Sequence, residues 1–339
     1  GKLREQGIKI TPDNLKISDK AIICLPYHRL MDIMEEDRLA DKKFGSTRRG
    51  IAPVYADKYM KKALRMEDLL DMDSLYEKVK DIVEWKNITV KGYGHPSVDA
   101  DEIMDWLKKY GSEVAPYITD VSEYLYQAAA EGRNIMFEAQ LGALRDIDFG
   151  IYPYTSSSTT LASFAPIGAG VPGLTLTGTL GIMKAYSTCV GEGPFTVEMS
   201  GDEAEALRKA GGEYGAATGR PRRVGAFDIP ASKYGVRVQG ATEIALTKLD
   251  VLSYMDKIPV CTAYEIDGIK TTAFPTGQRL LRAKPVIEYL PGFGDVSKCR
   301  TYEELPQAAK DYIAYIEKAV ACKITYVSVG AGRDEYIKL

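Results

Sequence analysis

The chain has 339 residues, a length typical of one elaborated α/β domain or of about two domains. Hydrophobic residues make up 45% of it and charged residues 27%, and the net charge of −3 excludes a chain-wide basic field that would recruit nucleic acid or an anionic membrane. Five scattered cysteines and two histidines argue against a disulfide framework, a structural zinc site or a His-rich metal centre, and favour a cytoplasmic protein.

The first half of the chain predicts mostly helices. A short apolar run at 21–25 is typical of a buried strand, and Pro26 ends it. Hydrophobic residues recur at helical spacing over 66–85, over 97–111 and over 114–125. We expect a small helical insertion at 62–132 within a single domain that spans residues 1–339. No apolar run reaches the length of a membrane span, so no membrane partner is expected.

In the second half, strands and helices alternate. The pattern predicts strands at 134–140, 243–252 and 323–329 and helices at 203–211 and 301–320. Residues 181–195 resemble a helix, and Asp267-Gly268 marks the turn of a hairpin within 258–274. This order predicts an α/β fold with a mainly parallel central sheet flanked by helices, a small helical insertion and a β-hairpin.

Three arginines lie in a stretch that offers them no apolar cover. Arg220, Arg222 and Arg223 stand among Gly, Ala and Thr in EYGAATGRPRRVGAFD, residues 213–228. A solvated surface loop is one interpretation. The other is an anion site, because small residues let backbone N–H groups approach a ligand and arginine offers a planar fork to carboxylate or phosphate.

A lysine and an aspartate lie in TKLD, residues 247–250, which closes the apolar strand predicted within 243–252. Lys248 and Asp250 stand where α/β proteins bind their ligands. A carboxylate there can accept hydrogen bonds from both N1–H and the exocyclic amine of guanine, whereas adenine has no such pair of donors. The lysine stem can cover the base. The alternative is a pair of charged side chains that point into water.

Other glycine-rich and serine-rich stretches do not match known catalytic motifs. GAGVPG at 168–173 has the glycine spacing of a dinucleotide loop but lacks the strand that should precede it. No G-x-x-x-x-G-K-[ST] loop occurs, and the serines at 156–158 have no nucleophile elbow.

Several long stretches, taken in chain order, resemble the motifs of adenylosuccinate synthetases. They are GSTRRGIAPVYADK, FEAQLGALRDIDFGIYPYTSSSTT, KAYSTCVGEGPF, EYGAATGRPRRVGAFD, LTKLDVL and VSVGAGR. The resemblance covers essentially the whole chain. It implies a homodimeric ligase of purine and AMP biosynthesis that joins IMP to L-aspartate, uses GTP and Mg²⁺, and forms a 6-phosphoryl-IMP intermediate. It implies no nucleic-acid partner.

The resemblance also implies three sets of binding residues. The GTP set is Arg222, Lys248, Leu249, Asp250, Ser328, Val329 and Gly330. The IMP set is Thr47, Lys61, Gln140, Leu141, Ser156 and Arg220. The aspartate set is Ala216, Ala217, Thr218, Gly219, Arg220, Pro221 and Arg222.

The start of the chain departs from the family pattern. The opening G-D-E-G-K-G loop and the catalytic histidine that follows it have no counterpart, and His28 is expected to be structural. We predict that this catalytic segment and most Mg²⁺ ligands lie outside the chain, which would then hold no catalytic residue and be inactive alone. The alternatives are a truncated, non-catalytic paralogue that binds GTP or IMP, and an ATP-dependent ligase.

Two further positions differ from the family. In FEAQLG, Leu141 stands where the IMP-contacting glutamine usually lies, and Gln140 is one residue earlier. Lys61 replaces an arginine that reaches across the dimer interface to the IMP phosphate. Lysine keeps the charge but cannot form the bidentate fork.

Overall fold

The computed structural model describes residues 2–215 and 219–339, which form two compact units. The first unit consists of residues 1–138, 156–158 and 164–175, and the second of residues 139–155, 159–163 and 176–339.

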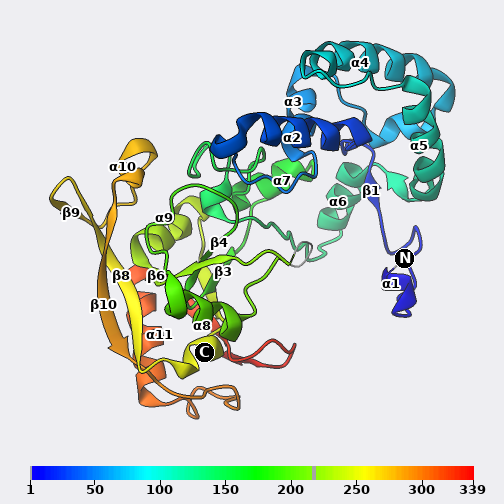
Figure 1. The fold of residues 1–339 in the computed structure, drawn as a ribbon. Helices are drawn as coiled ribbons and strands as arrows, with labels where there is room; N and C mark the ends of the chain where they lie inside the picture. Colours follow the sequence, from blue (N-terminus) through cyan, green and yellow to red (C-terminus); the bar gives the residue numbers. More distant parts are fainter. Residues whose placement is uncertain (1, 216–218) are drawn as a thin grey trace. The chain divides into compact units, whose positions relative to one another are not determined.

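The first unit is mainly helical (Figure 1). Its α-helices are α1 Lys2–Glu5, α2 Pro26–Leu39, α3 Ile51–Met60, α4 Met72–Gly92, α5 Ala100–Val114, α6 Val121–Ala130 and α7 Ala165–Gly168. Short 3-10 helices are η1 Ala40–Lys42, η2 Met66–Leu70 and η3 Ala115–Tyr117. Two short parallel strands, β1 Ile17–Ser18 and β2 Ile118–Thr119, pair with each other.

An aspartate is the N-cap residue of each of the three α-helices in the predicted insertion, α4, α5 and α6. The carboxylate of Asp71 accepts from the backbone N–H of Ser74 at the start of α4, and Asp99 and Asp120 cap α5 and α6 in the same way. The apolar stripes of α4 and α5 then pack into one core, which includes Leu75, Val79, Ile82, Ile103 and Leu107. The insertion at 62–132 stays a prediction.

Two predictions for the first unit are wrong. Residues 21–25 form no strand. Ile22 makes an isolated bridge to Arg65, and no strand among the described residues pairs with the run. Residues 114–125 are not one helix, because Pro116 and the cap at Asp120 divide them into the end of α5, η3, β2 and the start of α6.

The second unit contains most of the strands. The strands are β3 Leu180–Lys184, β4 Ser187–Cys189, β5 Arg223–Gly225, β6 Phe227–Asp228, β7 Glu243–Thr247, β8 Lys257–Ile266, β9 Ile269–Thr271, β10 Lys284–Pro291, β11 Lys323–Ser328 and β12 Tyr336–Lys338. The α-helices are α8 Gly201–Gly211, α9 Ile229–Gln239, α10 Gly277–Leu281 and α11 Gln307–Val320. The 3-10 helices are η4 Ala143–Arg145 and η6 Asp250–Tyr254, and a further one, η5 Ala162–Phe164, crosses the boundary between the units.

A four-stranded sheet with the order β12-β11-β7-β3 carries the candidate site. Strands β3 and β11 both run parallel to the central strand β7, and β12 is an antiparallel edge. A second sheet orders β10-β8-β6, with β9 paired to β8, and β4 pairs with β5. The predicted α/β class, with a mainly parallel sheet and a hairpin, is confirmed.

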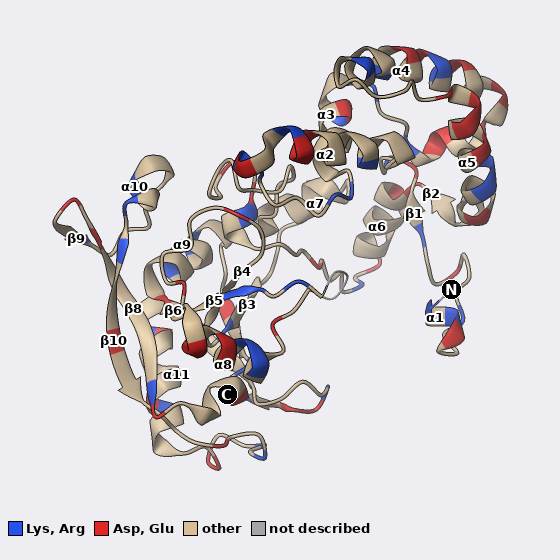
Figure 2. Ribbon diagram, in the orientation of Figure 1, with Lys and Arg blue, Asp and Glu red and all other residues tan. Residues whose placement is uncertain are grey.

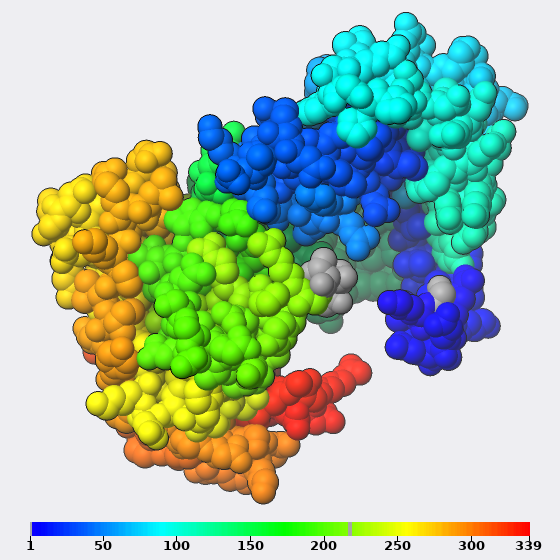
Figure 3. Space-filling view, in the orientation of Figure 1, coloured from blue at the N-terminus to red at the C-terminus, as the bar shows by residue number. Residues whose placement is uncertain are grey.

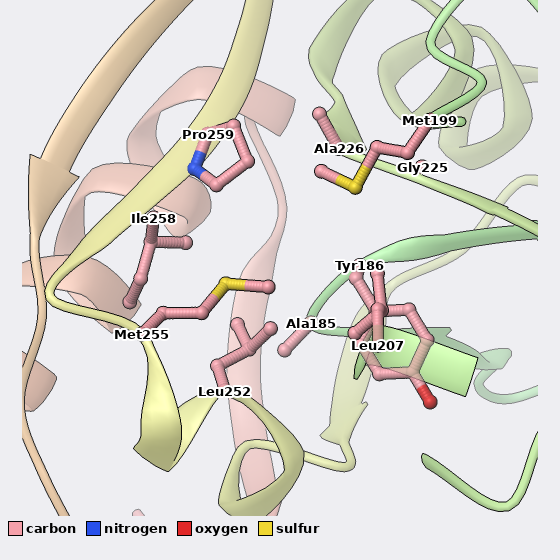
Figure 4. Close-up of a pocket in the computed structure, with 10 residues that line it drawn as sticks. All are labelled: Ala185, Tyr186, Met199, Leu207, Gly225, Ala226, Leu252, Met255, Ile258 and Pro259. Carbon is pink, nitrogen blue, oxygen red and sulfur yellow. The ribbon is translucent and has the colours of Figure 1, made fainter. Parts of the chain in front are cut away.

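The core of the second unit forms around β7 and α11. Ile244 and Leu246 on β7 are fully buried together with Ile316 on α11. The hydroxyl of Tyr312 donates to the carbonyl of Ala185 at 2.6 Å, which fastens α11 to the segment after β3. Ten mostly apolar residues line a small pocket in this region, and Figure 4 shows the side chains of Met199, Met255 and Tyr186 there. Because its lining is apolar and includes no predicted site residue, we assign it to packing.

The strand and helix predictions for this unit had mixed outcomes. The hairpin turn at Asp267-Gly268 is confirmed, with both residues at positive φ as a two-residue turn requires. Residues 134–140 form no strand, and 181–195 form β3 and β4 instead of a helix. The C-terminal helix begins at Gln307 rather than at 301, and Pro306, with ψ of 148°, is the non-helical N-cap residue before it.

No helix in the described part of the chain is both long enough and apolar enough to cross a membrane.

Candidate functional site

The carboxyl ends of β3, β7 and β11 meet at one edge of the sheet, where parallel α/β sheets bind ligands. Lys184 ends β3, Thr247 ends β7 and Ser328 ends β11. The backbone N–H of Leu249 donates to the carbonyl of Ser328 at 3.1 Å. The structure thus brings the predicted TKLD segment beside the predicted 328–330 segment.

Lys248 turns the chain at the end of β7. Its backbone lies in the left-handed region, with φ of 61°. Its ammonium donates to the carbonyl of Gly211 at 2.5 Å and lies 3.2 Å from a carboxylate oxygen of Glu213. The side chain is therefore held at its tip, which leaves its aliphatic stem in a defined orientation.

Asp250 carries a buried oxygen without a partner. Its Oδ1 is shielded from solvent and makes no hydrogen bond to any described residue. Burial raises the pKa of this carboxyl above its ordinary value. A buried acceptor left unpaired is costly, so this atom is suited to accept from the N–H groups of a ligand.

Glu213 lies at the centre of a cluster of cations. Its side chain is fully buried, and its carboxylate contacts Lys184 at 2.8 Å, Arg222 at 2.8 Å and Lys248 at 3.2 Å. The hydroxyl of Tyr186 donates to the same carboxylate at 2.6 Å. The three cations are 25% to 34% exposed, so each can also contact a ligand. One carboxylate cannot balance three cations, and the cluster keeps a surplus of positive charge.

Burial alone would raise the pKa of the Glu213 carboxyl. The hydrogen bonds from Lys184 and Tyr186 and the charges of Lys184 and Lys248 outweigh burial and lower the pKa to about 2 from its ordinary 4.5. Because the folded pKa is depressed, the stabilisation is present above about pH 4.5 and is lost as the pH falls through 2.

We expect the free energy of unfolding to fall by roughly 3 kcal/mol between about pH 5 and pH 2 through Glu213 alone. The measurement is urea unfolding across this range for the wild-type chain and Glu213→Gln, whose amide does not titrate. The variant should show the shallower pH dependence. Equal slopes would contradict the assignment.

Residues 219–223, called the arginine segment below, lead into β5, and the basic residues there are coloured blue in Figure 2. Tyr214 and Pro221 form an isolated antiparallel bridge, and Arg222 donates its backbone N–H to the carbonyl of Glu213 at 2.9 Å. Arg220 lies 3.3 Å from Glu192. The Nε of Arg222 is buried and has no acceptor among the described residues, so it can bind an anion.

Three members of the predicted aspartate set, Ala216, Ala217 and Thr218, lie outside the described residues. Gly219, the next member, has φ of 65° and donates its backbone N–H to the carbonyl of Gly215 at 2.7 Å.

The loop between β11 and β12 projects from the second unit (red in Figure 3). Ser328 Oγ donates to the carbonyl of Gly330 at 2.9 Å, and the backbone N–H of Val329 donates to the carbonyl of Glu335 at 2.9 Å. A Cβ at Gly330 would come within 2.4 Å of the Glu335 carboxylate. Any other residue at 330 would require the Glu335 side chain to shift, so the loop is closely packed against its own residues.

In the first unit, two carboxylates of α2 hold the segment that carries Thr47. Asp32 accepts from the hydroxyl of Ser46 at 2.6 Å and from the backbone N–H of Gly50 at 2.8 Å. Glu36 accepts from the backbone N–H groups of residues 44 and 45, each at 3.1 Å. Both carboxylates are buried and lie one helical turn apart, so they form one support.

The remaining predicted IMP residues are placed unit by unit. In the first unit, Lys61 is an exposed residue at the end of α3, and Ser156 Oγ lies 3.2 Å from Ser158 Oγ. In the second unit, Gln140 is exposed, and Leu141 has φ of 79° with more than half of its surface exposed.

His28 belongs to a buried charged cluster of the first unit. Its Nδ1 accepts from the backbone N–H of Leu25 at 2.8 Å, so its Nε2 carries the proton and donates to Asp57 at 2.9 Å. Asp57 also pairs with the ammonium of Lys86, and all three side chains are buried. Burial lowers the pKa of His28, against the opposing effect of Asp57. These contacts agree with a structural histidine.

Among the described residues, no group of three or more His, Cys, Asp or Glu side chains could hold a metal ion. No step proposed below depends on the Mg²⁺ that the resemblance implies.

The predicted binding sets omit Lys184, Tyr186 and Glu213, although all three lie within the motifs quoted from the sequence. Glu213 is a single acid that follows Gly211-Gly212, and nothing in its neighbours indicates burial. Lys184 and Tyr186 lie in the segment interpreted as a helix. Recognising a strand that ends at Lys184 would have placed this lysine at the same sheet edge as Lys248.

Comparison with known proteins completes the description of the site. The family model described as adenylosuccinate synthetase matches residues 1–337. The chain is 43% identical to the adenylosuccinate synthetase of Halothermothrix orenii and 41% identical to that of Clostridium novyi, and in each case the match covers 99% of this chain and 79% of the relative. The solved structure of a fully ligated adenylosuccinate synthetase from Plasmodium falciparum superposes with a TM-score of 0.92 at 30% identity, covering 100% of this chain and 82% of that one. The chain therefore belongs to the adenylosuccinate synthetase family.

Proposed function

We propose that this protein catalyses the GTP-dependent ligation of IMP and L-aspartate to adenylosuccinate, a step of AMP biosynthesis. Family membership and the conserved order of the motifs quoted above support the proposal. The comparisons give no support to the prediction that a catalytic segment is missing or to the prediction that the chain is inactive.

The observation that carries the proposal is the unpartnered Oδ1 of Asp250 at the carboxyl end of β7. In the proposed complex this carboxylate accepts from N1–H and the 2-amine of guanine, a pair of donors that adenine lacks. The stem of Lys248 covers the base, and Leu249 and residues 328–330 bound it. The buried Nε–H of Arg222, which has no acceptor among the described residues, would donate to an anionic group of the ligand.

The proposed reaction has two chemical steps. First, IMP loses its N1 proton to solvent or a base, and its 6-oxygen attacks the terminal phosphorus of GTP. A new P–O bond forms at that oxygen, the bond to the bridging oxygen breaks, and GDP leaves. The aspartate amine then attacks C6, inorganic phosphate leaves with the oxygen, and the amine loses a proton. Arg220, Arg222 and the 216–222 segment would bind aspartate and stabilise developing charge, since phosphoryl transfer depends mainly on positioning and electrostatics.

The assignments for IMP are part of the same proposal. Thr47, Ser156 and Arg220 would bind IMP, with Gln140 or Leu141 near the base. Lys61 would reach the IMP phosphate of a second subunit in a homodimer. The support of the Thr47 segment by Asp32 and Glu36 suits a phosphate-binding loop, because it fixes backbone that would otherwise be free to move.

Asp250→Asn tests the nucleotide assignment. Asparagine keeps the shape but removes a charged acceptor and introduces a donor that opposes the guanine N–H groups. We expect GTP affinity to fall about 10- to 100-fold and the preference for GTP over ATP to shrink, as measured by direct titration of the chain with each nucleotide. Asp256→Asn, at an exposed carboxylate six residues further on, is the control and should leave both affinities unchanged. An unchanged GTP affinity in Asp250→Asn would remove the guanine assignment.

A further inference from the structure

Glu213 is a fully buried acid that none of the proposed chemical steps uses. Its backbone is fixed on both sides, because its N–H donates to the carbonyl of Arg208 at 2.9 Å and its carbonyl accepts from Arg222 at 2.9 Å. The carboxylate is therefore placed by the end of α8 and the start of β5, whatever its side-chain partners do.

The partners of the Glu213 carboxylate come from separate parts of the second unit. Lys184 ends β3, Arg222 precedes β5 and Lys248 follows β7. Tyr186 adds a neutral donor, and Figure 4 shows its ring among apolar side chains, which fixes the direction of its hydroxyl. One buried group thus connects the segment before β5 to the ends of β3 and β7, which are neighbours in the sheet.

The electrostatics give this connection a specific effect. Three cations gathered around one point repel one another, and the repulsion is strong where water is largely excluded. The carboxylate is what makes their proximity favourable, since it pairs with all three at 2.8 to 3.2 Å. Removing its charge would leave the cations to move apart toward solvent, which their partial exposure allows.

We propose that Glu213 is a positioning residue of the nucleotide site. Its carboxylate sets the spacing between Arg222, on the phosphate and aspartate side, and Lys248, on the base side, and it adds Lys184 to the same cationic array. This inference rests on the proposed function, which assigns Arg222 and Lys248 to GTP. It adds two residues, Glu213 and Lys184, that none of the predicted binding sets contains.

The test is a double-mutant cycle read as GTP affinity. Glu213→Gln keeps the side-chain volume and should weaken GTP binding about 10- to 100-fold. Arg222→Gln should weaken it as well. If Glu213 acts through Arg222, adding Glu213→Gln to the Arg222→Gln chain should cost markedly less than it costs in the wild type, because the group that it positions is already gone.

The matched control is Glu198→Gln. Glu198 pairs with Arg223 at 2.5 Å in the same arginine segment but lies on the exposed side of it, with 38% of its side chain exposed. Its loss should change GTP affinity less than about threefold. Melting curves show whether each variant is folded. If Glu213→Gln does not fold, Glu213→Asp replaces it in the cycle. Aspartate keeps the negative charge, but its side chain is too short to reach all three cations.

Each outcome decides a different question. If wild-type and Glu213→Gln chains bind GTP equally well, or if the two losses simply multiply in the double variant, the positioning role is wrong while the proposed function stands. If the wild-type chain does not bind GTP, the proposed function is wrong and the positioning role is wrong with it.

Discussion

Replacing Asp57 with asparagine should lower the free energy of unfolding by about 3–5 kcal/mol, the largest loss we expect from any single charge in the first unit. Asp57 is fully buried and pairs with Lys86, which is 2% exposed, while it accepts from His28 at 2.9 Å and from the hydroxyl of Tyr27 at 3.3 Å. Asparagine fits the space but leaves the Lys86 ammonium buried without a counter-charge. Urea unfolding of both chains measures the loss.

Two comparisons sharpen this result. Asp37 also pairs with a cation, Arg48 at 2.8 Å, but the pair is about half exposed, so Asp37→Asn should cost no more than about 1 kcal/mol. Adding Lys86→Met to Asp57→Asn should recover part of the loss, because it removes the stranded charge. Equal losses for Asp57→Asn and Asp37→Asn would show that the buried cluster does not stabilise the unit as described.

Gly50→Ala should destabilise the first unit by about 2–4 kcal/mol. Gly50 has φ of 85°, which a residue with a Cβ adopts at a cost, and a Cβ there would lie 2.8 Å from the backbone carbon of His28 and 2.9 Å from the backbone nitrogen of Arg29. Backbone atoms at the start of α2 cannot yield as a flexible side chain could. The strain would also reach the Thr47 segment, because Gly50 donates its N–H to Asp32.

Gly94→Ala separates the two causes of this effect. Gly94 lies in the same unit and has φ of 76°, but a Cβ there would meet nothing within 4 Å. Its substitution should cost only the backbone strain, about 1 kcal/mol. A cost at Gly50 no greater than at Gly94, measured by thermal or urea unfolding, would mean that the loop shifts to accommodate the methyl group.

Sequence patterns within a single segment predicted the hairpin and strand β7. The hairpin at Asp267-Gly268 follows from turn chemistry. An apolar run predicts strand β7, but the strand ends at Thr247 and not at 252, because the chain turns at Lys248 and enters η6. The errors at 21–25 and 134–140 concern short apolar runs that could be strands only if a partner strand lay beside them. Residues 181–195 show the reverse case, because β3 becomes a strand through its pairing with β7, which lies some sixty residues further on.

The candidate site divides in the same way. Lys248 and Asp250 could be predicted because they follow a strand directly, and the structure places them beside Ser328. Glu213 could not be predicted, because its importance depends on Lys184 and Lys248, which are distant from it in sequence. Tertiary packing buries this acid among cations. The local sequence, a glutamate after two glycines, does not indicate that burial.

The left-handed backbone of Lys248 has a consequence for engineering this protein. Glycine or asparagine would adopt that conformation at lower cost than lysine does. A library screened for heat resistance alone would therefore tend to replace Lys248 and to discard the side chain that we assign to the nucleotide base. Thermostabilisation of this fold should hold position 248 fixed and seek its gains at surface positions away from the carboxyl ends of β3, β7 and β11.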